Sequence, residues 1–503
     1  MEDFKCCCST ERIKTKILIY NTSNCYVISN DTPENKLKRT NVGTFGLFFQ
    51  GLGQEAPIAI FIGSVTGAAA FALGATPLAF LIGMVASLLS GNSIYQLSKK
   101  ISHAGGYAAY VNRGLGKHMA VFSGYLFILY ELVGPAFIIL IYFWTFSSSI
   151  NAVTGSNLPD YIGIAFIALA LVIAFVVVYR GLKLSVFSLT IIGLVQFAIV
   201  FIISSVLLIK APVKTFTPFL PTTALNGWHG VFLGFITGSY GAYAGYGSVV
   251  PLGEEVKSPR KSIGRAVLLI IVIMGVTYLF ATYAMVSSWG INLMSSFAQS
   301  GFPGAILAGQ FVTPSSESLV IALYDAVIFT PLVAMITAGS RMIFSMSRQK
   351  LLPEFLSEVH KKYGTPSRAV MFLTLLVSLV VVIDAALFWF TDGFETGIFY
   401  SWIILEIIWS LSTLLIHVFV NSSLSVQHNG RFSISEMITH ILFPTVATII
   451  ILLAIGYSLV GISMPIELAP IAVLVYSIIV ILIMVRQRST IRTLQFEELK
   501  DAE

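Results

Sequence analysis

The chain has 503 residues, of which 56% are hydrophobic and 11% charged, and its mean hydropathy is +0.86. Soluble globular domains carry about 25% charged residues, so this composition excludes a cytosolic enzyme, a disordered protein and a collagen-like fibre. At about 20 apolar residues for each crossing, the chain is long enough for about a dozen transmembrane helices. We therefore predict an all-α membrane protein that crosses the bilayer many times.

The N-terminal segment, residues 1–40, is polar and is predicted to be a cytoplasmic tail, because it is too charged for a signal peptide. It holds all four cysteines, Cys6, Cys7, Cys8 and Cys25. Their spacing matches neither a zinc site nor a disulfide framework. We expect reduced thiols on a mobile tail.

Twelve apolar stretches follow and predict twelve transmembrane helices. They lie at about 43–72, 76–98, 119–147, 160–179, 184–209, 228–252, 264–288, 317–345, 368–387, 395–420, 437–459 and 466–486. All but two of the 30 Lys and Arg residues fall on one side of this arrangement, the exceptions being Lys210 and Lys214. Positive charge marks the cytoplasmic side, so both termini, including the tail 487–503, are expected there, and the membrane is expected to be the plasma membrane. The same asymmetry explains the net charge of +6 without a nucleic acid partner.

Two of the twelve stretches contain residues that disfavour a continuous helix. Residues 51–59 combine glycines with Gln54, Glu55 and Pro57, and residues 238–247 contain four glycines. Broken backbone at membrane depth is tolerated only inside the protein or beside a cavity. The two breaks lie five spans apart, which predicts inverted repeats over 41–210 and 228–420 within a core of 41–420, and two peripheral helices over 421–486.

Four motifs then carry a family resemblance. They begin at Gly253-Glu254-Glu255-Val256-Lys257-Ser258-Pro259-Arg260, at Arg341 with Arg348, at Ala104-Gly105-Gly106-Tyr107 and at Gly181-Leu182-Lys183. In this order the chain resembles the amino acid–polyamine–organocation (APC) superfamily of permeases. The resemblance implies the LeuT-type five-plus-five inverted repeat and secondary transport of amino acids.

The resemblance also implies a substrate site at the two breaks. Backbone N–H groups near Ile58, Ala59 and Ile60 would meet a substrate carboxylate, and carbonyls near Glu55 and Ala56, beside Gln54, would meet its amine. Pro57 stands where the family has a glycine, and it has no N–H to offer. In the second break the implied residues are Tyr243 as the gating aromatic, Ala244 as a carbonyl donor to the amine site, and Gly245 and Tyr246.

Ionisable side chains within the spans are candidates for ion coupling. Glu55 would carry a proton, balance a cationic amine, or cap a helix end, and Glu131 lies in the middle of the third span. Gln196 occupies the place where some proton-coupled relatives have a lysine. Thr330 is one of the separated hydroxyls of the eighth span, whereas sodium-coupled relatives use adjacent ones. H+ is therefore favoured over Na+, and no metal or cofactor is expected.

The prediction from sequence is proton-coupled uptake of amino acids by alternating access. An amine or polyamine carrier and an amino acid exchanger remain alternatives, as does a transporter-like nutrient sensor or a channel. No G-x-S-x-G, H-E-x-x-H or Walker A run is present, so an enzyme is not expected.

Overall fold

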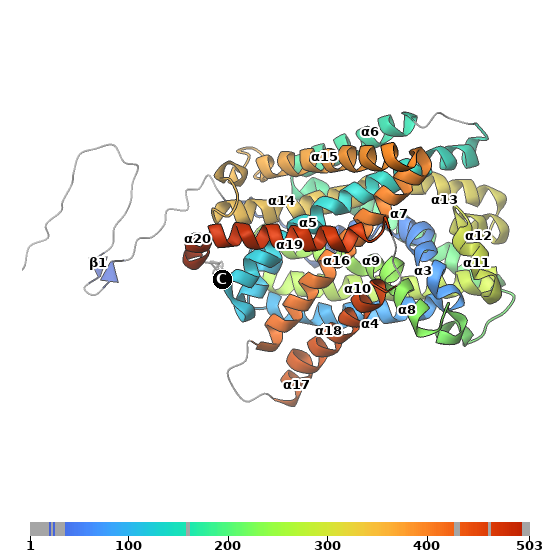
Figure 1. Cartoon of the computed structure of the whole chain (residues 1–503), viewed down its shortest axis with the longest axis horizontal. Coiled ribbons are helices and arrows are strands. Elements are labelled where there is room, and N and C mark those ends of the chain that lie inside the picture. Colours follow the sequence, from blue (N-terminus) through green and yellow to red (C-terminus); the bar gives the residue numbers. More distant parts are fainter. Residues whose placement is uncertain are drawn as a thin grey trace, which may run out of the picture.

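The computed structural model describes residues 20–21, 24–25, 36–156, 161–426, 433–460 and 464–494. Cys6, Cys7 and Cys8 lie outside the described residues, so the expectation of mobile, reduced thiols stays a prediction. Cys25 belongs to β2 (Asn24–Cys25), which pairs antiparallel with β1 (Tyr20–Asn21). Apart from this short pair, the regular elements of the described chain are helical (Figure 1).

The first half of the described chain forms nine helical pieces: α1 (Thr44–Glu55), α2 (Pro57–Ala59), the π-helix η2 (Ile60–Ser64), α3 (Val65–Ala72), the 3-10 helix η3 (Leu73–Ala75), α4 (Thr76–Ser98), α5 (Gly106–Thr154), α6 (Tyr161–Arg180) and α7 (Leu182–Lys210).

The pieces of the remaining described chain are η4 (Thr217–Phe219), η5 (Pro221–Thr223), α8 (Trp228–Gly234), η6 (Phe235–Ser239), α9 (Tyr240–Tyr243), η7 (Ala244–Leu252), α10 (Pro259–Trp289), η8 (Ile291–Leu293), α11 (Met294–Gln299), α12 (Pro303–Phe311), α13 (Pro314–Ala326), α14 (Phe329–Arg348), η9 (Glu354–Ser357), α15 (Ser367–Asp392), α16 (Phe394–Val426), α17 (Ile434–Met437), η10 (Ile438–Leu442), α18 (Phe443–Ser458), α19 (Leu468–Arg486) and α20 (Arg488–Thr493).

Ten helices of the described chain are long and apolar enough to cross a membrane. The difference from the twelve predicted spans has two causes. The first two predicted spans count as one stretch, Thr44–Ser98, because only the short turn η3 separates α3 from α4, although Leu73 at that turn has non-helical backbone angles (φ 46°, ψ −124°). The predicted span 228–252 is divided into α8, η6, α9 and η7, none of which is long enough alone. The chain is a multi-pass membrane protein, and the count of twelve crossings stays a prediction.

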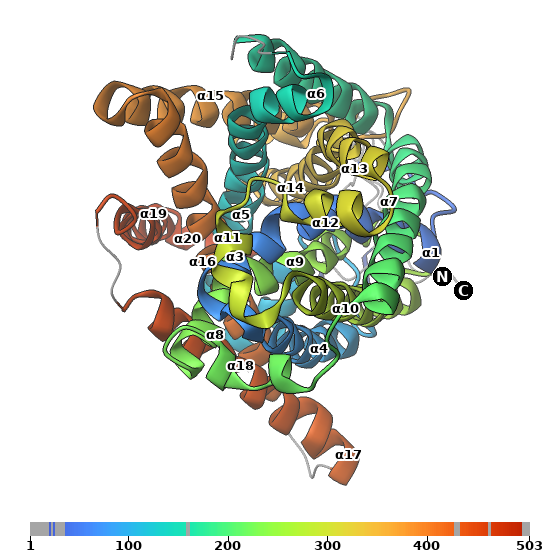
Figure 2. The ribbon, with the colours of Figure 1, turned by 90° about the vertical axis from the view of Figure 1, so that its right-hand side faces the viewer.

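The broken pieces lie inside the bundle. Viewed along the bundle, α9 lies near the middle, with α4, α5, α7 and α10 around it (Figure 2). Helices α6, α15 and α19 lie at the periphery, and they expose large apolar side chains such as Leu169, Leu375 and Leu482. Such a surface is suited to lipid, whereas the interior is where a solute site is expected.

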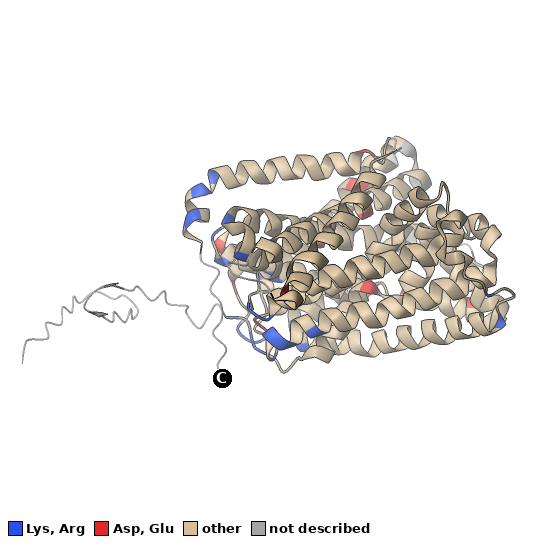
Figure 3. Cartoon of the chain, turned by 90° about the horizontal axis from the view of Figure 1, so that it is seen from below, with Lys and Arg blue, Asp and Glu red and all other residues tan. Residues whose placement is uncertain are grey.

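Lys and Arg residues gather at one end of the bundle, beside the C-terminal end of the chain (Figure 3). We call this end, where the Lys and Arg residues gather, the basic end. The grouping agrees with the charge count along the sequence. Which side of the membrane the basic end faces stays a prediction.

Both predicted tails contribute residues to the bundle. The N–H of Lys38 donates to the Gly364 carbonyl at 3.0 Å, and the N–H of Thr40 donates to the Glu255 carbonyl at 2.7 Å. Leu37 is buried, so packed structure begins before residue 40. At the other terminus α20 follows directly on α19 and buries Ile491.

Candidate functional site

Helix α1 ends at Glu55 in the interior of the bundle. Ala56 takes left-handed backbone angles (φ 46°, ψ 78°), and Pro57 begins α2. A proline has no N–H to continue the α1 ladder, and it is well tolerated at a first helical position. The sequence therefore forces a stop and a restart at this point.

The N–H groups that follow the break have partners within the protein. Ala59 and Ile60 both donate to the Ala56 carbonyl, at 2.7 and 3.2 Å. Ile58 donates to Oε1 of Gln196 on α7 at 3.4 Å. Each of the three N–H groups predicted to bind a carboxylate therefore already donates to an acceptor within the protein.

The second break faces the first. Helix α9 ends at Tyr243 and the chain continues as the 3-10 helix η7 from Ala244. A Cβ atom placed on Gly245 would lie 2.4 Å from Cγ of Glu55 and 2.6 Å from the Gly51 carbonyl oxygen. Only a glycine permits this approach, so the two broken helices are in direct contact.

Polar side chains surround the contact. Gln54 Nε2 donates to the Tyr130 hydroxyl at 2.8 Å, and that hydroxyl donates to the Ala244 carbonyl at 3.4 Å. The Tyr278 hydroxyl donates to Oε2 of Glu55 at 3.4 Å. At this contact the buried atoms Gln54 Oε1, Glu55 Oε1 and Gln196 Nε2 have no hydrogen-bond partner among the described residues.

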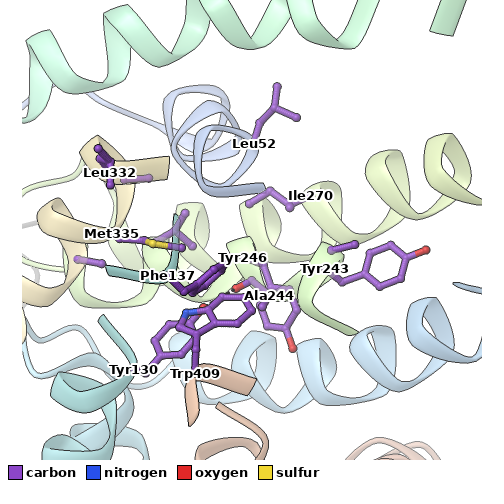
Figure 4. Packing of buried hydrophobic residues seen from close by; sticks show 14 of the residues in the cluster. Leu52, Tyr130, Phe137, Tyr243, Ala244, Tyr246, Ile270, Leu332, Met335 and Trp409 are labelled. Carbon is purple, nitrogen blue, oxygen red and sulfur yellow. Dashed lines mark hydrogen bonds between the residues drawn. The ribbon is translucent and has the colours of Figure 1, made fainter. Parts of the chain in front are cut away.

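Aromatic rings close the site on the side of α5 and α16 (Figure 4). Tyr130 stacks on Trp409 with ring centroids 5.0 Å apart, and Phe137 lies 5.3 Å from the same indole. Tyr243 donates its hydroxyl to the Phe80 carbonyl on α4, and Tyr246 bonds through its hydroxyl to Nε2 of His417.

Reasoning from sequence missed Tyr130, Tyr278 and Trp409 as neighbours of the breaks. Each lies on a helix that is regular where the residue falls, so no local break marks it. Their only signal is helical spacing, and that spacing is equally typical of ordinary core packing. The contact across the bundle is what distinguishes them.

The other coupling candidates lie elsewhere. Glu131 on α5 faces α14, because a Cβ on Gly339 would lie 2.7 Å from Cβ of Glu131. Neither carboxylate oxygen of Glu131 has a hydrogen-bond partner in the described part of the chain. Thr330 donates its hydroxyl to the Val327 carbonyl within its own turn. Of the four candidates, Glu55 and Gln196 reach the α1 break.

Two ion pairs join Glu254 and Glu255, which follow η7, to α14 at the basic end. Arg341 binds Glu255 through Nε and Nη2, at 2.7 and 3.1 Å, and both side chains are buried. Arg348 binds Glu254 through two nitrogens as well, at 2.5 and 2.9 Å. Two-pronged pairs of this kind fix geometry as well as charge.

His103, in the loop between α4 and α5, lies beside the second pair. Its Nδ1 accepts the Gly105 N–H at 2.8 Å, and its Nε2 lies 3.4 Å from Arg348. Burial lowers the pKa of His103 to about 4, although the negative charge of Glu254 opposes the shift. Burial alone would raise the pKa of Glu254, but hydrogen bonds and charge from Arg348 outweigh it and hold that pKa below its ordinary value.

The fold is that of a multi-pass membrane protein in which two broken helices are in contact inside the bundle. Comparison with known proteins agrees. The family model for amino acid permeases matches residues 46–495, so the chain belongs to the amino acid permease family of the APC superfamily. It is therefore a transporter and not an enzyme.

Individual relatives are distant but cover most of the chain. All three that follow are from Bacillus subtilis (strain 168). The branched-chain amino acid permease BcaP is 24% identical over 70% of this chain and 77% of its own length. The glutamate/serine transporter AimA is 26% identical over 76% and 70%. The methylthioribose transporter is 26% identical over 68% and 74%.

Proposed function

We propose that the protein is a secondary transporter of amino acids that works by alternating access. The observation that carries the proposal is the contact of the two broken helices at Gly51, Glu55 and Gly245, inside the bundle. The family and the names of BcaP and AimA support amino acids as substrates. The third relative's name, a methylthioribose transporter, shows that substrates differ within the group, so the solute is left at the level of a class.

The substrate ammonium is placed at the end of α1. Gln54 and Glu55 each hold an oxygen there without a partner among the described residues, and the Ala244 carbonyl lies on the facing helix. A helix C-terminus carries partial negative charge, which favours a cation. Tyr243 is the proposed gate, because it is the last residue of α9 at the second break and its hydroxyl donates to the Phe80 carbonyl on α4.

Proton coupling is assigned to Glu55. It is 3% exposed, and among the described residues its side chain accepts a hydrogen bond from the Tyr278 hydroxyl. A carboxyl group in the interior of a transporter can take up a proton on one side and release it on the other. Glu131 is the second candidate. Sodium has less support, because Thr330 already has a backbone partner and no adjacent hydroxyl accompanies it.

The proposed topology keeps the basic end in the cytoplasm of the cell and the protein in the plasma membrane. Residues 41–210 and 228–420 form the two repeats, and 421–486 the peripheral pair. Closure of the basic end by the pairs Arg341–Glu255 and Arg348–Glu254 gives the inner gate, which has to open in the other half of the cycle.

Uptake into proteoliposomes tests the proposal. Purified protein is reconstituted, and uptake of a labelled amino acid mixture is measured with an inward proton gradient present or collapsed. Saturable accumulation that disappears with the gradient is expected. Glu55→Gln should abolish accumulation, whereas Glu317→Gln, a change in the first turn of α13 where the side chain lies beside Gly309, should preserve it.

Other outcomes of the uptake experiment would indicate a different function. Uptake that ignores the gradient but needs internal amino acid indicates exchange. Uptake of amines in place of amino acids indicates an amine or polyamine carrier. Flux that does not saturate would contradict a carrier and indicate a channel, and binding without flux would indicate a sensor.

A further inference from the structure

The start of α2 leaves no N–H group for a substrate carboxylate. Pro57 has no N–H, Ala59 and Ile60 donate to the Ala56 carbonyl, and Ile58 donates to Gln196. A carboxylate taken out of water needs hydrogen-bond donors. If the transporter binds the carboxylate of an amino acid, another group at the break has to supply the hydrogen-bond donors.

Gln196 is in position to do so. Its amide orientation follows from Ile58, because an N–H needs an acceptor and therefore meets Oε1, which leaves Nε2 free to donate elsewhere. The side chain is fully buried, at 0% exposure, and Nε2 has no partner among the described residues. Buried donors without partners are rare, and each calls for an explanation.

The opposite side of the break has the complementary chemistry. Gln54 Oε1 and Glu55 Oε1 are buried acceptors that lack a donor in the described part of the chain. The Gly53 carbonyl loses its usual donor four residues on, because that residue is Pro57, and the Gln54 carbonyl loses its own because Ile58 turns to Gln196. A buried donor on α7 thus accompanies a group of acceptors at the end of α1.

We infer that Gln196 binds the carboxylate of the substrate. Its Oε1 holds the Ile58 N–H, and its Nε2 donates to the carboxylate, so a side-chain amide takes over from the backbone N–H that Pro57 removes. The ammonium then meets Gln54 and Glu55. This role rests on the proposed transport of amino acids, and it makes Gln196 a specificity residue and not a site of ion coupling.

The consequence is a preference for amino acids over their carboxamides. Each carboxamide keeps the ammonium and the side chain but has no negative charge to receive the Nε2 donor. A hydrogen bond to a charged group is stronger than one to a neutral group. We expect the wild-type protein to prefer the amino acid about tenfold or more.

Gln196→Glu is the sharpest variant. It has nearly the same shape and keeps an oxygen for the Ile58 N–H, but it replaces the donor with a second oxygen. The matched control is Gln50→Glu, the same change at a buried glutamine on α1 whose Nε2 donates to the Ala334 carbonyl at 3.1 Å. Gln196→Leu, which removes the amide altogether, is a third variant.

Two readouts are made on each protein. The first is the shift of the thermal unfolding midpoint in detergent with each common L-amino acid and with its carboxamide, which reports binding without transport. The second is inhibition of labelled amino acid uptake by the same compounds. We expect Gln196→Glu and Gln196→Leu to lose the tenfold preference and to keep carboxamide binding within about threefold, and Gln50→Glu to keep the preference.

The results separate this inference from the proposed function. A wild-type protein that accumulates amino acids but binds their carboxamides equally well overturns the role of Gln196 and leaves transport standing. The same holds if both Gln196 variants keep the wild-type preference. A Gln196-dependent preference in the thermal readout without any uptake supports the binding role and overturns transport. No binding and no uptake of any amino acid overturns both.

Discussion

Gly245 is the residue at which the two broken helices come closest. The space that a side chain would need is filled by Glu55 and by the Gly51 backbone. Gly63, also in the first broken region, has nothing within 4 Å of an added Cβ. A close contact between helices therefore requires glycine at position 245 but not at position 63, although both lie in glycine-containing stretches of sequence.

Gly245→Ala is expected to separate the breaks. Forcing a methyl group against backbone costs about 1–3 kcal/mol, and transport should fall by more than tenfold because the site loses its geometry. Gly63→Ala should change stability by less than about 0.5 kcal/mol. Uptake rates and thermal midpoints of both variants check this, and equal effects from the two changes would contradict the contact.

His103 gives a prediction for pH. Its pKa is about 4 in the folded protein against an ordinary 6.5, so the unfolded chain binds the proton more readily. The contribution of His103 to the free energy of unfolding is therefore fully present above about pH 6.5. It is lost as the pH drops towards 4, by up to about 3 kcal/mol. The lowered pKa of Glu254 acts in the same direction at the lower end of this range.

The measurement is the thermal midpoint in detergent between pH 7.5 and pH 5. His103→Asn should flatten the dependence, because an Asn oxygen can still accept the Gly105 N–H but does not titrate in this range. A midpoint that rises on acidification, or a variant with the wild-type slope, contradicts the prediction.

At the scale of elements, the break between α1 and α2 is set by Pro57. The proline follows the end of one helix, starts the next, and has no N–H of its own to donate. Gln196 then reaches from α7 to the first available N–H. The chemistry of the break is thus shared between two helices that are distant in sequence.

Restoring an N–H should repair the loss of Gln196. In the Gln196→Leu background, Pro57→Gly supplies the missing donor at the start of α2 without adding a side chain. We expect the preference for an amino acid over its carboxamide to return in part, by about threefold to tenfold. Competition assays on the single and double variants measure it, and a double variant no better than Gln196→Leu would be the contrary result.

The sequence alone predicted these elements to different degrees. The break at Pro57 and the glycine-rich break before Gly247 were predicted because proline and glycine act on the backbone locally. The partners Tyr130, Tyr278 and Trp409 were not, because their contacts are made between helices more than 70 residues apart in the chain. Likewise Glu254 and Glu255 were recognised as a motif, but their arginine partners became clear only in the fold.

At the scale of the whole molecule, the buried pair Arg341–Glu255 ties the second break to α14 at the basic end. Arg341→Ala leaves a buried carboxylate without its partner, which should cost about 3–5 kcal/mol. Arg368→Ala breaks an ion pair with Glu358 whose side chains are 49% and 58% exposed, and should cost less than about 1 kcal/mol. Chemical or thermal unfolding in detergent compares them, and a similar cost for both would contradict the assignment.

The segment Leu37–Val42 has a consequence for how the protein is made. It is synthesised well before its hydrogen-bond partners at Glu255 and Gly364, the latter 326 residues after Lys38 (364 minus 38). At about 5–20 residues per second, Gly364 is added to the chain roughly 16–65 seconds after Lys38. The segment therefore has to wait beside the membrane while most of the bundle is inserted, and its docking marks a late step of assembly.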